Sequence, residues 1–170
     1  MGAALLTFPI AGYVGWGIAG HVDAVGSALL GGGITGLGIG LGQWLLLRRE
    51  FNVGPAWIPA TGVGLAIGLT AGAAAVGYET SAGALATMGA ISGAAVGLAQ
   101  GAVLRRTFSL WPAWIVAMPV LWAIAWLVSN AIGVDVTNQF TVFGASGSLI
   151  FGALSGLLLA ADNRRGGTPT

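Results

Sequence analysis

Few side chains in this sequence could take part in chemistry, and they do not cluster. The chain has one histidine, His21, and no cysteine. With Asp23 beside it, His21 could ligate a metal or a chlorin, but we favour a solvated histidine in an interfacial loop. On the other side of the membrane, Glu50 and Asp162 have no cysteine or histidine near them in the sequence, so no nucleophile-and-base pair is predicted. We therefore expect no enzyme activity and no metal or other obligatory cofactor.

Gln43 and Gln100 are the most prominent polar residues within apolar stretches, and each stands five residues before a pair of arginines. One interpretation is a polar lining of a hollow centre, shared with Thr35 and Ser92. The other is hydrogen bonding between helices, worth about 0.6 to 2 kcal/mol in a membrane. We favour the second interpretation, because a later copy of the same sequence pattern has Leu159 in place of the glutamine.

Two further kinds of chemistry are disfavoured by the pattern. No Asp, Glu, Lys or Arg falls in the middle of an apolar stretch, whereas ion-coupled carriers place ionisable groups there. The stretch GITGLGIG, residues 33–40, resembles a dinucleotide-binding fingerprint, but it lies inside an apolar span with no strand before it.

The elements that must position these residues are membrane helices. The 170-residue chain is 56% hydrophobic and 6% charged, with a mean hydropathy of +0.89, whereas a soluble domain has about 25% charged residues. No stretch alternates apolar and polar residues at every second position, as the strands of a membrane β-barrel do. The net charge of +1 suggests no nucleic-acid partner. Since no basic segment precedes the first apolar stretch, we expect a retained helix there and not a cleaved signal peptide.

An all-α membrane protein of six transmembrane helices is predicted by cutting the chain at its charges, because a span needs about 20 apolar residues. The expected helices are Ala3–Gly20, Ala24–Leu47, Trp57–Val76, Ala82–Leu104, Trp111–Val128 and Phe140–Ala161.

The arginines predict the orientation of these helices. All cations form three pairs, each after an even-numbered helix, whereas the opposite loops hold only Asp23, Glu79 and Asp135. Because short cationic loops stay in the cytoplasm, both termini are predicted to be cytoplasmic, in the bacterial inner membrane. The pairs would also meet anionic lipid head groups. They are Arg48 and Arg49, Arg105 and Arg106, and Arg164 and Arg165.

Residues 32–58 return as residues 89–115, with 14 of the 27 positions identical at a shift of 57. A weaker third copy aligns at a shift of 59. We expect a single membrane domain, 1–170, made of three two-helix repeats in a pseudo-threefold bundle. The repeats run over about 1–50, 51–107 and 108–166, followed by a short tail, 167–170.

Glycines at every fourth position mark one face of each even helix. Such faces let membrane helices approach closely, so we expect them to hold the even helices together in an inner ring; the alternative is that they line a narrow conduit. The glycines are Gly32, Gly36, Gly40, Gly89, Gly93, Gly97, Gly101, Gly152 and Gly156.

The fifth helix breaks the pattern, since it lacks glycine and carries the stripe Trp114, Met118, Trp122 and Trp126. This stripe could face lipid, or it could be a docking face for another membrane subunit or for a flat ligand such as a pigment or quinone. Trp57 and Trp114 also begin the odd helices just after the arginines, where tryptophan commonly anchors a helix at the interface.

The phrase G-x-x-x-G-L-x-Q-x-x-x-L-R-R, over Gly36–Arg49 and Gly93–Arg106, resembles that of uncharacterised small bacterial multi-pass membrane proteins built from repeated helical hairpins. This resemblance implies the same fold over most of the chain and supplies no active residues.

Three functions remain open from the sequence. The first is an accessory or scaffolding subunit of a larger membrane complex, with membrane lipids and other membrane subunits as partners. The second is a passive channel or facilitator for a small solute. The third is a lipid, quinone or pigment binder. A filled bundle centre would favour the first, and a hollow centre lined by Gln43, Gln100, Thr35 and Ser92 would favour the second.

Overall fold

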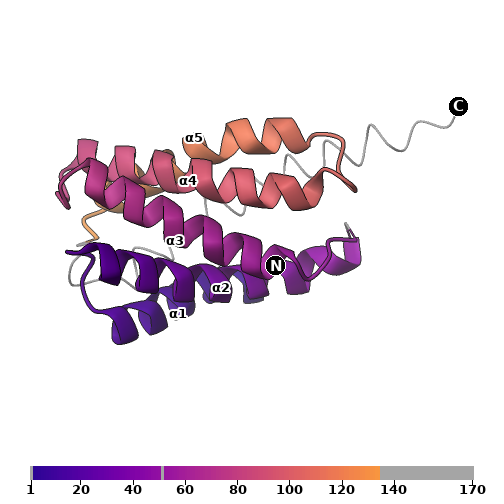
Figure 1. The fold of residues 1–170 in the computed structure, drawn as a ribbon, viewed down its shortest axis with the longest axis horizontal. Coiled ribbons are helices and arrows are strands. Elements are labelled where there is room, and N and C mark those ends of the chain that lie inside the picture. The colour runs from indigo at the N-terminus through magenta and orange to yellow at the C-terminus, as the bar shows by residue number, and fades with distance from the viewer. Residues whose placement is uncertain (1, 51, 135–170) are drawn as a thin grey trace, which may run out of the picture.

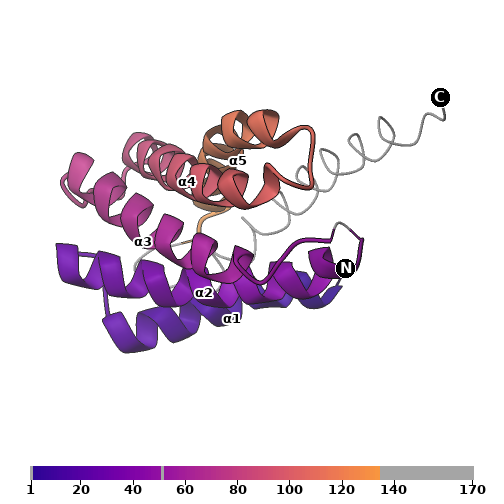
Figure 2. The same ribbon diagram turned by 45° about the vertical axis from the view of Figure 1, so that its right-hand side comes forward.

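The computed structural model describes residues 2–50 and 52–134, and the side chains of residues 9–49 and 52–134. This part of the chain is helical and contains no strand. Its five helices follow one another up and down in chain order, and each packs on the next (Figures 1 and 2). The helices are α1 (Gly2–Ala19), α2 (Val25–Glu50), α3 (Trp57–Ala75), α4 (Ala82–Leu104) and α5 (Trp111–Ala131).

The all-α prediction is confirmed for this part, and each described helix begins and ends within three residues of its predicted bounds. The sixth expected helix, Phe140–Ala161, lies outside the described residues, together with Gly152, Gly156, Arg164 and Arg165. The pseudo-threefold arrangement therefore stays a prediction.

Glycines and a serine set the turns at one end of the bundle. Gly77 and Gly133 follow α3 and α5 with positive φ angles of 61° and 79°. After each, the next amide donates to the carbonyl five residues back, at 2.9 and 3.2 Å, which closes the helix end. Ser81 then caps α4, because its hydroxyl accepts from the amide of Ala84 at 3.3 Å.

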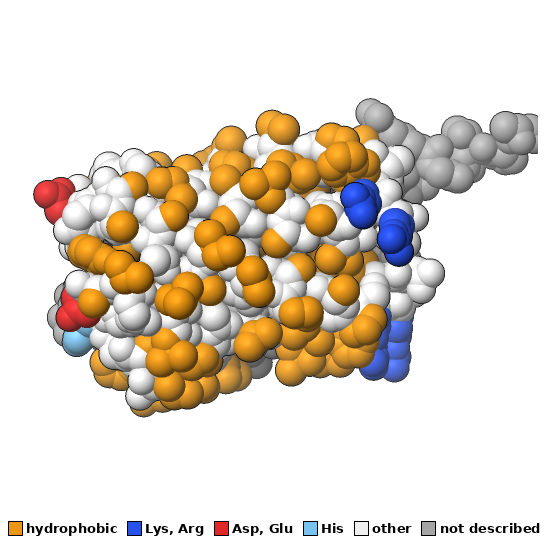
Figure 3. Space-filling view, in the orientation of Figure 1, with side chains coloured by type: hydrophobic (Ala, Val, Ile, Leu, Met, Phe, Trp, Pro, Cys, Tyr) orange, Lys and Arg blue, Asp and Glu red, His pale blue; other side chains and the backbone are white. Residues whose placement is uncertain are grey.

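Four of these helices, α2 to α5, are long and apolar enough to cross a membrane. Figure 3 shows a broad hydrophobic belt between two charged ends, with Arg side chains at one end and Asp, Glu and His side chains at the other. This is the charge separation that the sequence predicted for the described loops. Which end faces the cytoplasm stays a prediction.

The glycine ridges pack against odd-numbered helices, and the expected inner ring of even helices is wrong for α2 and α4. No Cα pair of these two helices lies within 8 Å. A Cβ added to Gly36 would lie 2.7 Å from the carbonyl oxygen of Thr61 in α3, and one added to Gly93 would lie 2.5 Å from that of Met118 in α5. The glycine ridge of an even helix thus packs against the next helix of the chain, because consecutive helices joined by a short loop are usually neighbours in space.

The same contacts recur 57 residues further along the chain. Gly32 lies against Leu65 as Gly89 lies against Trp122, and Gly40 lies against Ile58 as Gly97 lies against Ile115. Each residue in the α4–α5 contacts stands 57 positions after its counterpart in the α2–α3 contacts, which is the shift of the sequence repeat. The α2–α3 and α4–α5 interfaces are therefore built from equivalent residues.

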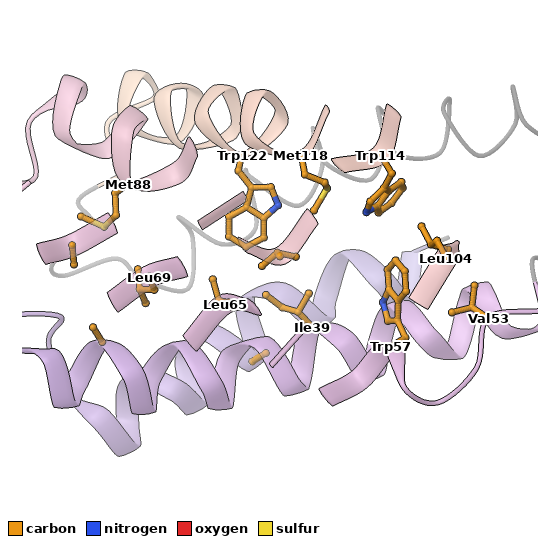
Figure 4. Packing of buried hydrophobic residues seen from close by; sticks show 14 of the residues in the cluster. Ile39, Val53, Trp57, Leu65, Leu69, Met88, Leu104, Trp114, Met118 and Trp122 are labelled. Atoms are coloured by element: carbon orange, nitrogen blue, oxygen red, sulfur yellow. The ribbon is translucent and has the colours of Figure 1, made fainter. Parts of the chain in front are cut away.

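The tryptophan stripe of α5 faces inward, so both expectations for an exposed stripe are wrong. Trp114, Met118 and Trp122 are 2%, 1% and 8% exposed, and Trp126 is partly buried against the same core. In Figure 4, Met118 and Trp122 point from α5 toward Leu65. The glycine ridge of α4 has room for these large side chains, and their burial fills the space that the missing Cβ atoms leave.

Candidate functional site

Three buried polar residues of the described chain, Gln43, Thr61 and Gln100, converge near the arginine end of the bundle. Gln100 Nε2 donates to Gln43 Oε1 at 3.1 Å, which joins α4 to α2 although their backbones do not touch. Both glutamines precede an arginine pair by five residues, about 7 Å along a helix. The interhelical hydrogen bond that the sequence suggested is present.

Two tryptophans complete the connection. Trp57 Nε1 donates to Gln43 Oε1 at 3.0 Å, and Trp114 Nε1 donates to Gln100 Oε1 at 3.2 Å. The rings of Trp57 and Trp114 meet edge to face, with centroids 5.8 Å apart (Figure 4). The expectation that they anchor α3 and α5 at the interface is wrong, since they are 0% and 2% exposed. A buried indole N–H needs an acceptor, and each finds one in a glutamine.

Thr61 of α3 ties the glutamines to the helix between them. Its hydroxyl accepts from Gln100 Nε2 at 2.9 Å and donates to the carbonyl of Trp57 at 2.9 Å. The amide of Gln100 therefore uses both its oxygen and its nitrogen. We refer to Gln43, Trp57, Thr61, Gln100 and Trp114 as the glutamine network.

The contacts settle which atom of each glutamine is the oxygen. Gln43 Oε1 accepts from two N–H donors, Trp57 Nε1 and Gln100 Nε2. If the Gln43 amide were flipped, its NH2 group would face the N–H groups of Trp57 and Gln100, which are also donors. The Gln43 nitrogen must therefore point away from both. That nitrogen has no hydrogen-bond partner among the described residues.

Thr35 and Ser92, the other two expected lining residues, lie apart from the network. The Thr35 hydroxyl donates to the carbonyl of Ala11 in α1 at 3.4 Å. Ser92 is 0% exposed, and its Oγ has no hydrogen-bond partner. The structure thus brings Gln43 and Gln100 together and leaves Thr35 and Ser92 at separate helix contacts.

At the acidic end, His21 is exposed and its ring meets the edge of Trp16, with centroids 6.1 Å apart. Among the described residues there is no group of three His, Cys, Asp or Glu side chains that could hold a metal. At the other end, the Arg48 guanidinium lies 4.8 Å from the centre of the Trp44 ring. The indole N–H of Trp44 donates to the carbonyl of Val53 at 3.1 Å, so the helix end and the following loop are held together.

The partners of the glutamines were missed from the sequence alone, although a signal was present. The spacing of 14 residues between Gln43 and Trp57 is repeated between Gln100 and Trp114. A polar residue and an indole that recur at one spacing are a candidate donor–acceptor pair. Thr61 carried no such signal, because position 118 of the second copy is a methionine.

The fold and this network define a class, the multi-pass helical membrane protein with a buried polar cluster. Comparisons with protein-family models, with curated proteins and with solved structures found no match to this chain.

Proposed function

We propose that the protein is an accessory or scaffolding subunit of a larger membrane complex, in the bacterial cytoplasmic membrane. One observation carries the proposal: the glutamines bond to each other and to buried indoles and do not line a path. Gln100 and Thr61 are 0% exposed. Hydrogen bonds that join four helices through one buried network make the bundle a rigid element, suited to holding partners in place.

We also propose the repeated architecture and the topology on which this function rests. The recurrence of glycine contacts at a 57-residue shift and the paired Trp–Gln bonds support a repeat. With the third copy of the pattern in the sequence, we extend this repeat to a pseudo-threefold bundle. The separation of charges between the two ends supports cytoplasmic arginine loops and, with six helices, cytoplasmic termini.

The lipid-facing surface is where a partner would bind, since the tryptophan stripe is covered. Val63 of α3 is 57% exposed and Val116 of α5 is 72% exposed. Such residues contact lipid in a lone bundle and protein in a complex.

The test is purification of the tagged protein from its native membrane in a gentle detergent, with mass spectrometry of the accompanying chains. A photo-crosslinking residue at Val63 or Val116 should join the same partner that co-purifies. Ala125 of α5, which is 4% exposed, is the matched control position and should give no cross-link between chains. A single species without stoichiometric partners, with no cross-link from either valine, would contradict the proposal.

One observation favours a passive facilitator as the second candidate. The buried Ser92 hydroxyl has no protein partner, and such a group commonly bonds to a water or another small polar molecule. Solute flux into liposomes holding the purified protein would support this candidate if Ser92→Ala changed the flux. The pigment or quinone binder loses its main support, because the aromatic stripe that motivated it is buried.

A further inference from the structure

The amide nitrogen of Gln43 stands out among the polar groups of the glutamine network. The side chain is 9% exposed, yet its Nε2 donates to no described residue, while its oxygen accepts two hydrogen bonds. A donor that exchanges water for apolar surroundings is costly to leave without an acceptor. The nitrogen therefore calls for an acceptor from outside the described protein.

The repeat explains why this acceptor is missing. Gln100 uses its nitrogen on Thr61 and on Gln43. Shifted back by 57 residues, the position of Thr61 is Ala4. Alanine has no side-chain acceptor, so the first copy lacks the counterpart of the hydrogen bond between Gln100 and Thr61.

The surroundings of Gln43 are also more open than those of Gln100. Gln100 is 0% exposed and Val103, three residues later, is half-buried. Gln43 is 9% exposed, and Leu46, at the position equivalent to Val103, is 38% exposed. The first copy therefore presents a donor without a described partner beside exposed apolar surface, at the point where the second copy is more deeply buried.

The depth of Gln43 suits one acceptor in particular. Arg48 follows Gln43 by five residues, which places its backbone about 7 Å nearer the membrane surface. Bilayers of about 30 Å hydrocarbon and 40–45 Å total thickness have an interfacial layer of about 5 to 8 Å on each side. With the Arg48 backbone at the level of the lipid phosphates, Gln43 lies where the hydrocarbon begins, and this is the level of the ester carbonyls.

We propose that Gln43 Nε2 binds an ester carbonyl of an anionic diacyl glycerophospholipid from the arginine-side leaflet. The acyl chain lies over Leu46, and the phosphate lies at the level of Arg48 and Arg49, which are exposed. The site belongs to the first copy alone, and it does not depend on whether the protein is a scaffold or a facilitator.

The test compares two lipids that differ only in the carbonyl. Native mass spectrometry of the purified protein would measure binding of dioleoylphosphatidylglycerol and of its dialkyl ether counterpart. The ester lipid should bind about threefold to tenfold more tightly, as expected for one hydrogen bond in a membrane. Equal binding of the two lipids to the wild-type protein would overturn the proposal.

Two variants and a control tie this difference to the nitrogen. Gln43→Leu removes the donor, and Gln43→Glu replaces it with an oxygen while keeping an acceptor for Trp57 and Gln100. Both should bring the ester-to-ether ratio close to one. Thr87→Val is the control, since the exposed Thr87 hydroxyl bonds only within its own helix, away from the glutamine network, and this variant should keep the ratio. An ester preference that survives in both Gln43 variants would also overturn the proposal.

Discussion

The substitution Gln100→Leu should destabilise the bundle more than Gln43→Leu, although both remove one glutamine from the same network. Leucine has a similar volume and fits an apolar environment, so packing changes little. The difference lies in the hydrogen bonds. Gln100 takes part in three of them, with Gln43, Thr61 and Trp114, whereas Gln43 takes part in two, with Trp57 and Gln100.

The magnitudes follow from the worth of one such bond. Hydrogen bonds between membrane helices average about 0.6 kcal/mol, with a maximum near 1.7. Gln100→Leu should therefore lower the free energy of unfolding by about 2 kcal/mol, and Gln43→Leu by about 1 kcal/mol. The two glutamines share one bond, so the double variant should lose about 0.6 kcal/mol less than the sum of the single losses.

The assay is reversible unfolding in mixed micelles, followed by circular dichroism, for the wild type, the two single variants and the double variant. Thr87→Val is the matched control, because the exposed Thr87 hydroxyl bonds only to the carbonyl of Gly83 within its own helix, at 2.9 Å. This control should change stability by less than about 0.5 kcal/mol. Equal losses for the two glutamine variants, or strictly additive losses in the double variant, would refute the network as described.

Three further outcomes are expected. Gly36→Ala should cost about 1 to 3 kcal/mol of unfolding free energy, because the new Cβ would press on a backbone carbonyl of α3. Gly17→Ala is its control and should cost none, since nothing lies within 4 Å of the added Cβ. Equal effects of the two variants in the same unfolding assay would contradict the ridge packing. Ser92→Ala should leave stability unchanged or raise it by up to about 1 kcal/mol in that assay, since it removes a buried hydroxyl without a partner. The chain has no cysteine, so Thr80→Cys and Thr107→Cys can be compared directly; a membrane-impermeant maleimide applied to intact cells should label position 80 alone, and labelling of position 107 alone would reverse the topology.

The bounds of the described helices and the separation of charges could be predicted because they depend on local sequence. In a membrane, each backbone polar group must be satisfied within its own helix, so a long apolar stretch between charges is enough to predict a span. For Gly36 and Gly93, the sequence predicted a close contact with another helix and nothing more specific. The glycines marked a helix-packing face, but they did not indicate which helix would lie on it.

The tryptophans of α5 show that the sequence alone does not indicate which face of a membrane helix is buried. A stripe of Trp114, Met118 and Trp122 is equally compatible with lipid and with a protein core, because lipid tails are as apolar as the side chains of the core. Hydrophobicity therefore does not separate the inner face of a membrane helix from its outer face. The tertiary structure decides it, since the glycine ridge of α4 provides the space for these residues and Gln100 provides the acceptor for the Trp114 indole. The sequence determined which segments are long and apolar enough to cross a membrane and how the charges are distributed between them, and only the packed structure determined which faces meet.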